Sequence, residues 1–264
     1  MSIYVDKWIL LECCALALAF GAAMGSFLNC AAFRVARHES FVSGRSRCPA
    51  CGHELSARDL VPVLSWLALR GRCRYCGARV SARYPLAELA FAAVTLGCLL
   101  RFDLTWLLLR NWIFLACLFC LSLVDLDCFE IPDGCLLISA AAWAATAPAL
   151  GLTWREAGTH LLSALVYGGG ILLISLALDR LLGRESLGGG DVKLIAVVGL
   201  YLGFIQGLFA IIFACLLGLA MLAFRRRRGG GETLPFGPAI AASAGAMLFA
   251  GEALTGWYLG LFYL

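Results

Sequence analysis

Long apolar runs separated by short polar segments restrict this chain to folds built in a membrane. Hydrophobic residues make up 62% of its 264 residues and charged residues only 14%, proportions unlike those of a soluble domain. A helix that crosses a bilayer needs about 20 consecutive, mostly apolar residues. The sequence therefore predicts an all-α polytopic membrane protein.

The first apolar run covers residues 8–33 and is broken only by Glu12 and Asn29. It has no small-residue cleavage signal after a basic start, so we expect a retained transmembrane helix and not a cleaved signal peptide. The other predicted spans are residues 85–100, 105–124, 133–150, 158–178, 192–204, 207–224 and 236–261. We thus predict about eight transmembrane helices, with the sixth and seventh as a possible single bent unit around residues 203–207.

The basic residues indicate the orientation of these spans. With the amino terminus outside, an arrangement of eight spans places 17 of the 21 Lys and Arg residues on one side. Cytoplasmic loops carry such an excess, so we expect that side to face the cytoplasm. The net charge of +4 then reflects topology and not nucleic-acid binding, although anionic lipid contact remains open.

A polar segment, residues 34–84, separates the first span from the membrane core of residues 85–264. It contains Cys48-Pro49-Ala50-Cys51 and Cys73-Arg74-Tyr75-Cys76, each followed by a glycine. Paired CxxC motifs at this spacing are typical of a zinc ribbon in which Cys48, Cys51, Cys73 and Cys76 bind one structural ion. We therefore expect a small, zinc-ribbon-like cytoplasmic loop after the first helix.

Two disulfides or a redox CxxC are the alternatives at these cysteines. Predicted cytoplasmic placement argues against persistent disulfides, and the doubled motif argues against a single redox pair. His53 follows the first motif and is either a knuckle residue or a replacement ligand. The remaining cysteines lie in or beside apolar runs and behave as small hydrophobic residues.

Two aspartates are the strongest candidates for chemistry. Asp125 directly follows the third apolar run, and Asp191 ends the segment Gly188-Gly189-Gly190-Asp191 before the sixth. The predicted topology places both at the cytoplasmic face, and an ionisable group beside hydrocarbon is a functional-site hypothesis. The other interpretation is a flexible glycine linker with Asp191 as an ordinary helix N-cap.

Neighbouring carboxyl groups share a proton, so one can activate water while the other polarises a carbonyl group. This is the aspartic-protease route to peptide hydrolysis. Metalloprotease and serine-hydrolase motifs are absent from the sequence, which contains only three histidines.

The chain resembles the prepilin peptidase family, the membrane aspartic proteases that process type IV pilins and type II secretion pseudopilins. The segments that carry the resemblance are Gly25 to Asn29 with Arg34, the paired CxxC motifs, Arg83 to Glu88, Asp125 with Ile131-Pro132-Asp133, Gly188 to Lys193, and Pro235-Phe236-Gly237-Pro238. Each motif is short, but together they cover nearly the whole chain in the family's order.

The resemblance implies that Asp125 and Asp191 are the catalytic pair, with Asp127 as the local rival, and that residues 85–264 form a transmembrane aspartic protease core. It implies prepilin or pseudopilin substrates, cut after a short basic leader at the cytoplasmic face of the bacterial inner membrane. It also implies N-methylation of the new amino terminus with S-adenosylmethionine. The expected partners are these precursors and the lipid bilayer, without nucleic acid and with no oligomeric state assigned.

Further residues are candidates for substrate positioning: Gly188, Gly190, Lys193, Asn29, Glu88, Pro235 and Gly237. A structural role, as an interhelical hydrogen bond or an interface anchor, explains Asn29, Glu88 and Lys193 equally well. The segment around Pro235 and Gly237 forms either an unwound entrance to the site or the simple start of the last helix.

Two other functional classes remain to be compared. A secondary transporter also places carboxylates and broken helices within a bundle, but the acidic pair lies near one face and no convincing inverted repeat is present. A non-enzymatic scaffold for pilus or secretion assembly would retain the cysteine loop without needing either aspartate.

Overall fold

The computed structural model describes residues 7–40, 44–183, 187–229 and 234–261. These residues form eight α-helices and one short 3-10 helix, and within them no β-strand occurs. Six helices are long and apolar enough to cross a membrane. The predicted all-α, multi-pass membrane class is confirmed. Arg184, one of the residues used to orient the spans, lies outside the described ranges.

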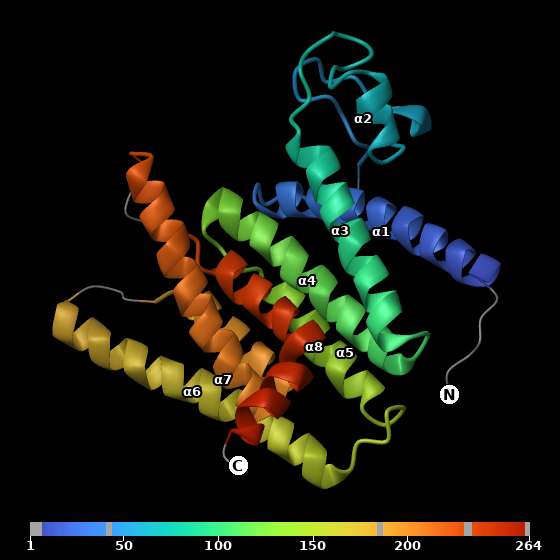
Figure 1. Cartoon of the computed structure of the whole chain (residues 1–264). Helices are drawn as coiled ribbons and strands as arrows, with labels where there is room; N and C mark the ends of the chain where they lie inside the picture. The colour runs from blue at the N-terminus through green and yellow to red at the C-terminus, as the bar shows by residue number, and fades with distance from the viewer. Residues whose placement is uncertain (1–6, 41–43, 184–186, 230–233, 262–264) are drawn as a thin grey trace. The chain divides into compact units, whose positions relative to one another are not determined.

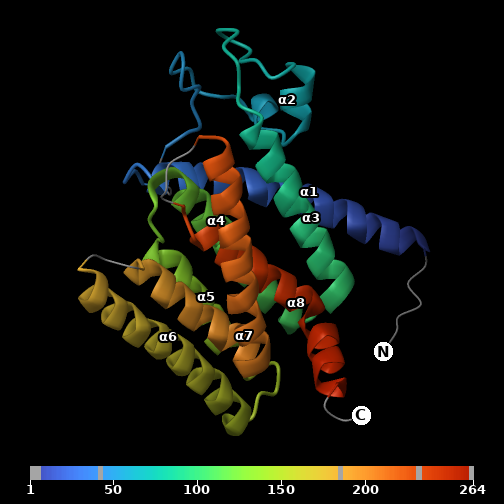
Figure 2. The same cartoon turned by 60° about the vertical axis from the view of Figure 1, so that its left-hand side comes forward.

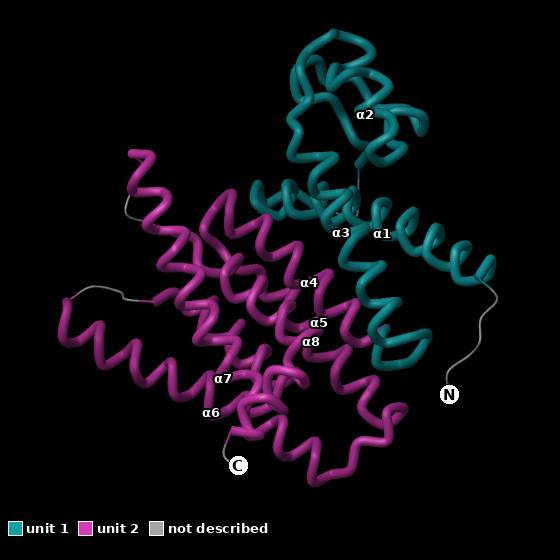
Figure 3. Tube along the Cα trace, in the orientation of Figure 1, with its two compact units in different colours: residues 1–108 teal, residues 109–264 magenta. Residues whose placement is uncertain are grey.

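The chain divides into two compact units, residues 1–108 and 109–264 (Figure 3). Unit 1 contains α1 (Lys7–Val35), the 3-10 helix η1 (Ala57–Asp59), α2 (Leu64–Ala68) and α3 (Arg83–Phe102). Unit 2 contains most of α4 (Trp106–Cys128), followed by α5 (Asp133–Thr146), α6 (Trp154–Leu182), α7 (Gly189–Arg227) and α8 (Gly237–Gly260).

In unit 1, two glycines of α1 allow α3 to pack closely against it (Figure 1). A Cβ atom at Gly21 would lie 2.7 Å from Oγ1 of Thr95, and one at Gly25 would lie 2.9 Å from the carbonyl oxygen of Ala87. Spacing of small residues by four positions is a common device for bringing two membrane helices together. The pair thereby forms the membrane part of unit 1.

In unit 2, α4 supplies much of the core. Its side chains Phe114, Leu121 and Val124 are almost completely buried. Helix α7 packs against α5, α6 and α8, so it connects the elements that follow α4 (Figures 1 and 2). This arrangement brings the end of α4 and the starts of α5 and α7 around one cavity. The start of α8 contacts Asp125, one of the residues that line it.

Helix α7 is bent at Gly203, where φ is 67° and ψ is −166° (Figure 2). Only glycine adopts this backbone conformation readily. Side chains of α6 contact the carbonyl groups beside this bend. Nδ1 of His160 lies 2.9 Å from the carbonyl oxygen of Leu200, and the hydroxyl of Tyr167 donates a hydrogen bond to the carbonyl oxygen of Phe204. The expectation of a bent unit at residues 203–207 is confirmed.

Helix α5 is shorter than the predicted span of residues 133–150. It ends at Thr146, and its 14 residues extend roughly 21 Å, less than the hydrocarbon thickness of a bilayer. Pro148 accounts for the early end, because proline has no backbone N–H with which to continue the helical hydrogen bonds beyond Ala147.

Candidate active site and metal-binding loop

The cysteine loop contains two turns of the same geometry. In the first, the N–H of Gly52 donates to the carbonyl oxygen of Cys48, whose own N–H donates to His53. In the second, Gly77, Cys73 and Ala78 make the equivalent bonds. Both glycines have positive φ angles, 69° and 72°, so the predicted knuckle turns are confirmed.

The two knuckles bring the four cysteine sulfur atoms together. All four lie within 4.8 Å of one another, and those of Cys48 and Cys76 are 3.9 Å apart. Each of the chain's 13 cysteines is a free thiol. Backbone N–H groups of Cys51 and Ala50 stabilise the thiolate of Cys48 and lower its pKa to about 7, which favours metal binding. The four cysteines can therefore hold a metal ion.

Asp59 connects the 3-10 helix to the second knuckle. Its side chain is only 4% exposed and accepts hydrogen bonds from Arg74 at 2.7 Å, from the Ser56 hydroxyl at 2.7 Å and from Tyr75 at 3.0 Å. The guanidinium of Arg74, followed by Ser56, holds the pKa of Asp59 well below its usual range. The ring of Tyr75 also lies 3.7 Å from that of His53, so His53 is a knuckle residue outside the sulfur cluster.

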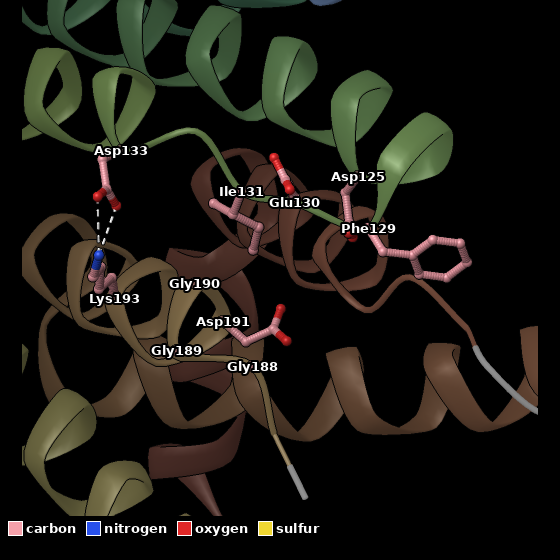
Figure 4. Close-up of a pocket in the computed structure, with 10 residues that line it drawn as sticks. All are labelled: Asp125, Phe129, Glu130, Ile131, Asp133, Gly188, Gly189, Gly190, Asp191 and Lys193. Carbon is pink, nitrogen blue, oxygen red and sulfur yellow. Dashed lines mark hydrogen bonds and ion pairs between the residues drawn. The ribbon is translucent and has the colours of Figure 1, made fainter. Parts of the chain in front are cut away.

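A cavity of about 330 Å³ in unit 2 contains both predicted catalytic aspartates (Figure 4). Asp125 reaches it from the end of α4 and Asp191 from the start of α7. The cavity is lined by Asp125, Phe129, Glu130, Ile131, Asp133, Gly188, Gly189, Gly190, Asp191 and Lys193. Four of these ten residues carry a carboxyl group, so the cavity can bind water and cationic groups.

Asp125 lies in the last turn of α4 and is 4% exposed. Its Oδ2 atom accepts a hydrogen bond of 2.8 Å from the backbone N–H of Gly237, the first residue of α8. Residues 234–236 before it are not helical, and Pro235 among them is buried. The segment thus leads into the last helix, and it contacts the site through the bond from Gly237 to Asp125.

Asp191 lies inside the first turn of α7, because Gly188 and not Asp191 is the N-cap residue. The ordinary N-cap interpretation of Asp191 is therefore wrong. Gly190 packs against the hairpin between α4 and α5, where a Cβ atom would lie 2.9 Å from Cβ of Ile131. A negative group near a helix N-terminus is also favourably placed relative to the helix dipole.

Lys193 connects α7 to α5. Its Nζ atom lies 2.8 Å and 3.0 Å from the two carboxylate oxygens of Asp133, which occupies the first turn of α5 (Figure 4). Glu130 and Asp133 are both exposed, and both also line the cavity. Phe129 and Ile131 were not predicted to take part. The available signal was their position in the short hairpin that follows Asp125.

The remaining candidates lie elsewhere. Asp127, the local rival, is exposed and is not among the residues that line the cavity. Asn29 is buried in α1. Glu88 is buried in α3, where its Oε2 atom accepts a hydrogen bond of 2.7 Å from the N–H of Val63. Glu88 therefore has a structural partner in unit 1.

The sequence matches two family descriptions. Residues 19–102 match the bacterial peptidase A24 N-terminal domain, and residues 112–223 match the type IV leader peptidase family. The boundary between these matches falls close to that between the two units.

Proteins named prepilin leader peptidase/N-methyltransferase are similar over much of the chain. The protein from Bacillus subtilis is 31% identical over 91% of this chain and 95% of its own length, and one from Burkholderia pseudomallei is 35% identical over 90% and 85%. The Myxococcus xanthus protein is 37% identical over 79% of this chain, which covers 63% of that longer protein. No solved structure matches the sequence.

Proposed function

The chain belongs to the type IV leader peptidase family, and from this premise we propose that it removes leader peptides from prepilins or pseudopilins with Asp125 and Asp191 as its catalytic pair. The family membership makes the chain a peptidase and not a transporter or an assembly scaffold.

The shared cavity is the observation that carries the catalytic assignment. Asp125 and Asp191 line it from α4 and α7, whereas the exposed Asp127 does not line it. The glycines at positions 188–190 also line the cavity, so a peptide backbone can approach Asp191 closely. These features support an aspartate dyad that acts on an extended peptide.

In the proposed reaction, the ionised carboxylate takes a proton from a water molecule held in the cavity. The water oxygen forms a bond to the carbonyl carbon of the scissile peptide, and the protonated carboxyl group gives its proton to the carbonyl oxygen. Collapse of this tetrahedral intermediate breaks the carbon–nitrogen bond, and the leaving amine takes up a proton. No covalent bond to the protein is required.

The hydrogen bond from Gly237 restricts where the shared proton can reside. An amide N–H can only donate, so Oδ2 of Asp125 acts as an acceptor. The proton of the pair is therefore carried by Asp191 or by the other oxygen of Asp125. Gly237 orients the dyad in this scheme, and Lys193 secures the hairpin beside it through Asp133.

We further propose that the cavity faces the cytoplasm at the inner membrane. The excess of basic residues predicted on that side supports this orientation. A precursor with a basic leader and a hydrophobic helix would then place its helix in the bilayer and its leader at the acidic cavity. Glu130 at the cavity wall favours approach of a basic segment, whereas the charge of Asp133 is already balanced by Lys193.

Zinc is the proposed ion of the four-cysteine cluster. Tetrahedral zinc with bonds of about 2.3 Å to sulfur separates neighbouring sulfur atoms by roughly 3.8 Å. The distance of 3.9 Å between the sulfurs of Cys48 and Cys76 fits this geometry. When bound, the ion would be held by Cys48, Cys51, Cys73 and Cys76 and would stabilise the loop without an open position for catalysis.

The relatives are named N-methyltransferases, which supports a methyl-transfer activity. We propose the new amino terminus as the acceptor and S-adenosylmethionine as the donor. We assign no residue of this chain to the donor. Incubation of the purified chain with the labelled methyl donor and cleaved pilin tests this activity separately from cleavage.

Co-expression of a precursor pilin with the wild-type chain and its variants tests the peptidase proposal. The wild-type chain should convert the precursor to a form shorter by its leader, resolved on a gel. Asp125→Asn and Asp191→Asn should each reduce cleavage by at least about 10²-fold, since general acid–base catalysis contributes this much. Asp127→Asn is the matched control and should retain cleavage. Full activity of a variant at position 125 or 191 would refute the dyad.

A further inference from the structure

The short helix α2 and the residues before it present an apolar surface in the cysteine loop of unit 1. Leu60, Val61, Leu64 and Leu67 are 43%, 42%, 66% and 57% exposed. We call these four residues the α2 surface. Clusters of large apolar side chains left in contact with water commonly mark interaction sites, because their burial is favourable.

A hydrogen bond determines where along the membrane helix α3 the α2 surface lies. The carboxylate of Glu88 accepts from the backbone N–H of Val63, which immediately precedes α2, at 2.7 Å. Glu88 lies five residues after Arg83, the first residue of α3, which corresponds to roughly 7.5 Å along the helix. Because α3 is one of the membrane-spanning candidates, the start of α2 lies beside the turns that enter the bilayer.

Two anchors hold α2 in one orientation. Val63 has a φ of 61°, a left-handed conformation that a β-branched residue rarely adopts, and the bond to Glu88 satisfies its N–H in that conformation. On the other side, the indole N–H of Trp66 donates to the carbonyl oxygen of Val80 at 3.1 Å, just beyond the second knuckle. These two hydrogen bonds thus connect α2 both to α3 and to the segment that follows the second knuckle.

Exposed arginines accompany the apolar side chains. Arg58 precedes the α2 surface, and Arg70 and Arg72 follow it. Large apolar residues with arginines on the flanks are typical of segments that lie in the interface of a membrane with anionic lipids. The loop is also tethered at both ends, by α1 and by α3, so it remains close to the headgroups.

We propose that the α2 surface inserts among the headgroups of a leaflet that contains anionic lipids and thereby docks the metal-binding loop on the membrane. Glu88 acts as the positioning residue for this contact, in place of the substrate role considered from the sequence. The proposal does not depend on the peptidase activity.

Amide hydrogen exchange of the full-length chain in lipid nanodiscs tests this docking. Peptides that cover residues 60–68 should exchange more slowly in nanodiscs with phosphatidylglycerol than in nanodiscs of phosphatidylcholine alone. Salt at about 1 M should remove the difference, since it reduces the screening length to about 3 Å. Equal exchange in the two kinds of nanodisc would overturn the proposal.

Variants separate lipid contact from loop folding. Leu64→Ser with Leu67→Ser should abolish the lipid-dependent protection, and Arg58→Gln should weaken docking by roughly fivefold, the equivalent of about 1 kcal/mol for one arginine near an anionic surface. The knuckle amides of residues 48–52 and 73–77 report whether the loop remains folded. Leu104→Ser removes a side chain that is 81% exposed outside the α2 surface and should change nothing. Protection that appears only after addition of a precursor pilin would assign the surface to substrate and refute lipid docking.

Discussion

The backbone N–H of Gly237 donates a hydrogen bond of 2.8 Å to Oδ2 of Asp125. This bond connects the start of α8 to the last turn of α4, although the two residues are far apart in the sequence. A Cβ atom at position 237 would lie only 2.7 Å from the same oxygen. The close approach explains why glycine occupies this position, and it links the orientation of a proposed catalytic carboxylate to the segment before α8.

Gly237→Ala should therefore impair cleavage without preventing insertion in the membrane. The added methyl group forces Asp125 away from its present position, and a displacement of about 1 Å at a catalytic group can reduce the rate roughly 100-fold. Initial rates of precursor cleavage measure the effect. Gly256→Ala, in the same helix with no atom within 4 Å of the added carbon, is the control and should cleave normally. A Gly237→Ala variant as active as this control would contradict the positioning role.

The glycines before Asp191 allow a sharper comparison. A Cβ atom at Gly190 would lie 2.9 Å from Cβ of Ile131, an atom attached directly to the backbone that cannot rotate away, whereas one at Gly189 meets no atom within 4 Å. We expect Gly190→Ala to separate α7 from the hairpin that follows α4 and to reduce cleavage at least tenfold, about 1.4 kcal/mol in barrier height. Gly189→Ala adds a methyl group that meets no protein atom, so it should reduce cleavage much less than Gly190→Ala does. Equal activity of the two variants would show that the contact with Ile131 is unimportant.

The sequence predicts where the apolar helices lie, because a helix that crosses a bilayer needs an apolar run of about 20 residues. Its eight predicted spans correspond to six membrane-spanning candidates and the shorter α5, since the sixth and seventh form the single helix α7. The sequence also predicts the cysteine knuckles, where the fixed spacing and the glycines at positions 52 and 77 determine the local geometry. The sequence-based prediction made α5 too long, at residues 133–150. The cause is local, because Pro148 lies within the predicted span and the helix ends before it, at Thr146.

The sequence could not predict the contacts that organise the site. The pairing of Lys193 with Asp133 and the bond of Glu88 to the backbone of Val63 depend on how helices approach one another, and no spacing rule encodes that approach. Gly237 could be selected as a candidate from its motif, but its partner could be identified only from the packing of α8 against the end of α4.

Removal of the metal should unfold the cysteine loop and leave the membrane helices in place. So small a segment buries too little apolar surface to fold alone, so its stability depends on the bound ion. We expect about one zinc ion per chain in the wild-type protein and none in Cys48→Ser, with a loss of amide protection at the knuckles. Cys215→Ser, which removes an exposed thiol of α7 outside the cluster, is the matched control. A wild-type chain that contains no metal, together with a folded Cys48→Ser loop, would refute the assignment.

Asp59 should stabilise the metal-binding loop with a defined pH dependence. Asp59→Asn removes the charge that binds Arg74, so zinc should be released to a chelator roughly tenfold faster, as for other supporting residues near metal ligands. The folded-state pKa of Asp59 lies below the unfolded value of about 3.9, so its contribution is complete above that value and is lost only as the pH falls through the folded-state pKa. The ratio of release rates between variant and wild type should therefore remain constant from about pH 6 to pH 8, where Asp59 is ionised in both states. A ratio that changes steadily across this range would show that another titrating group, and not Asp59, governs the difference.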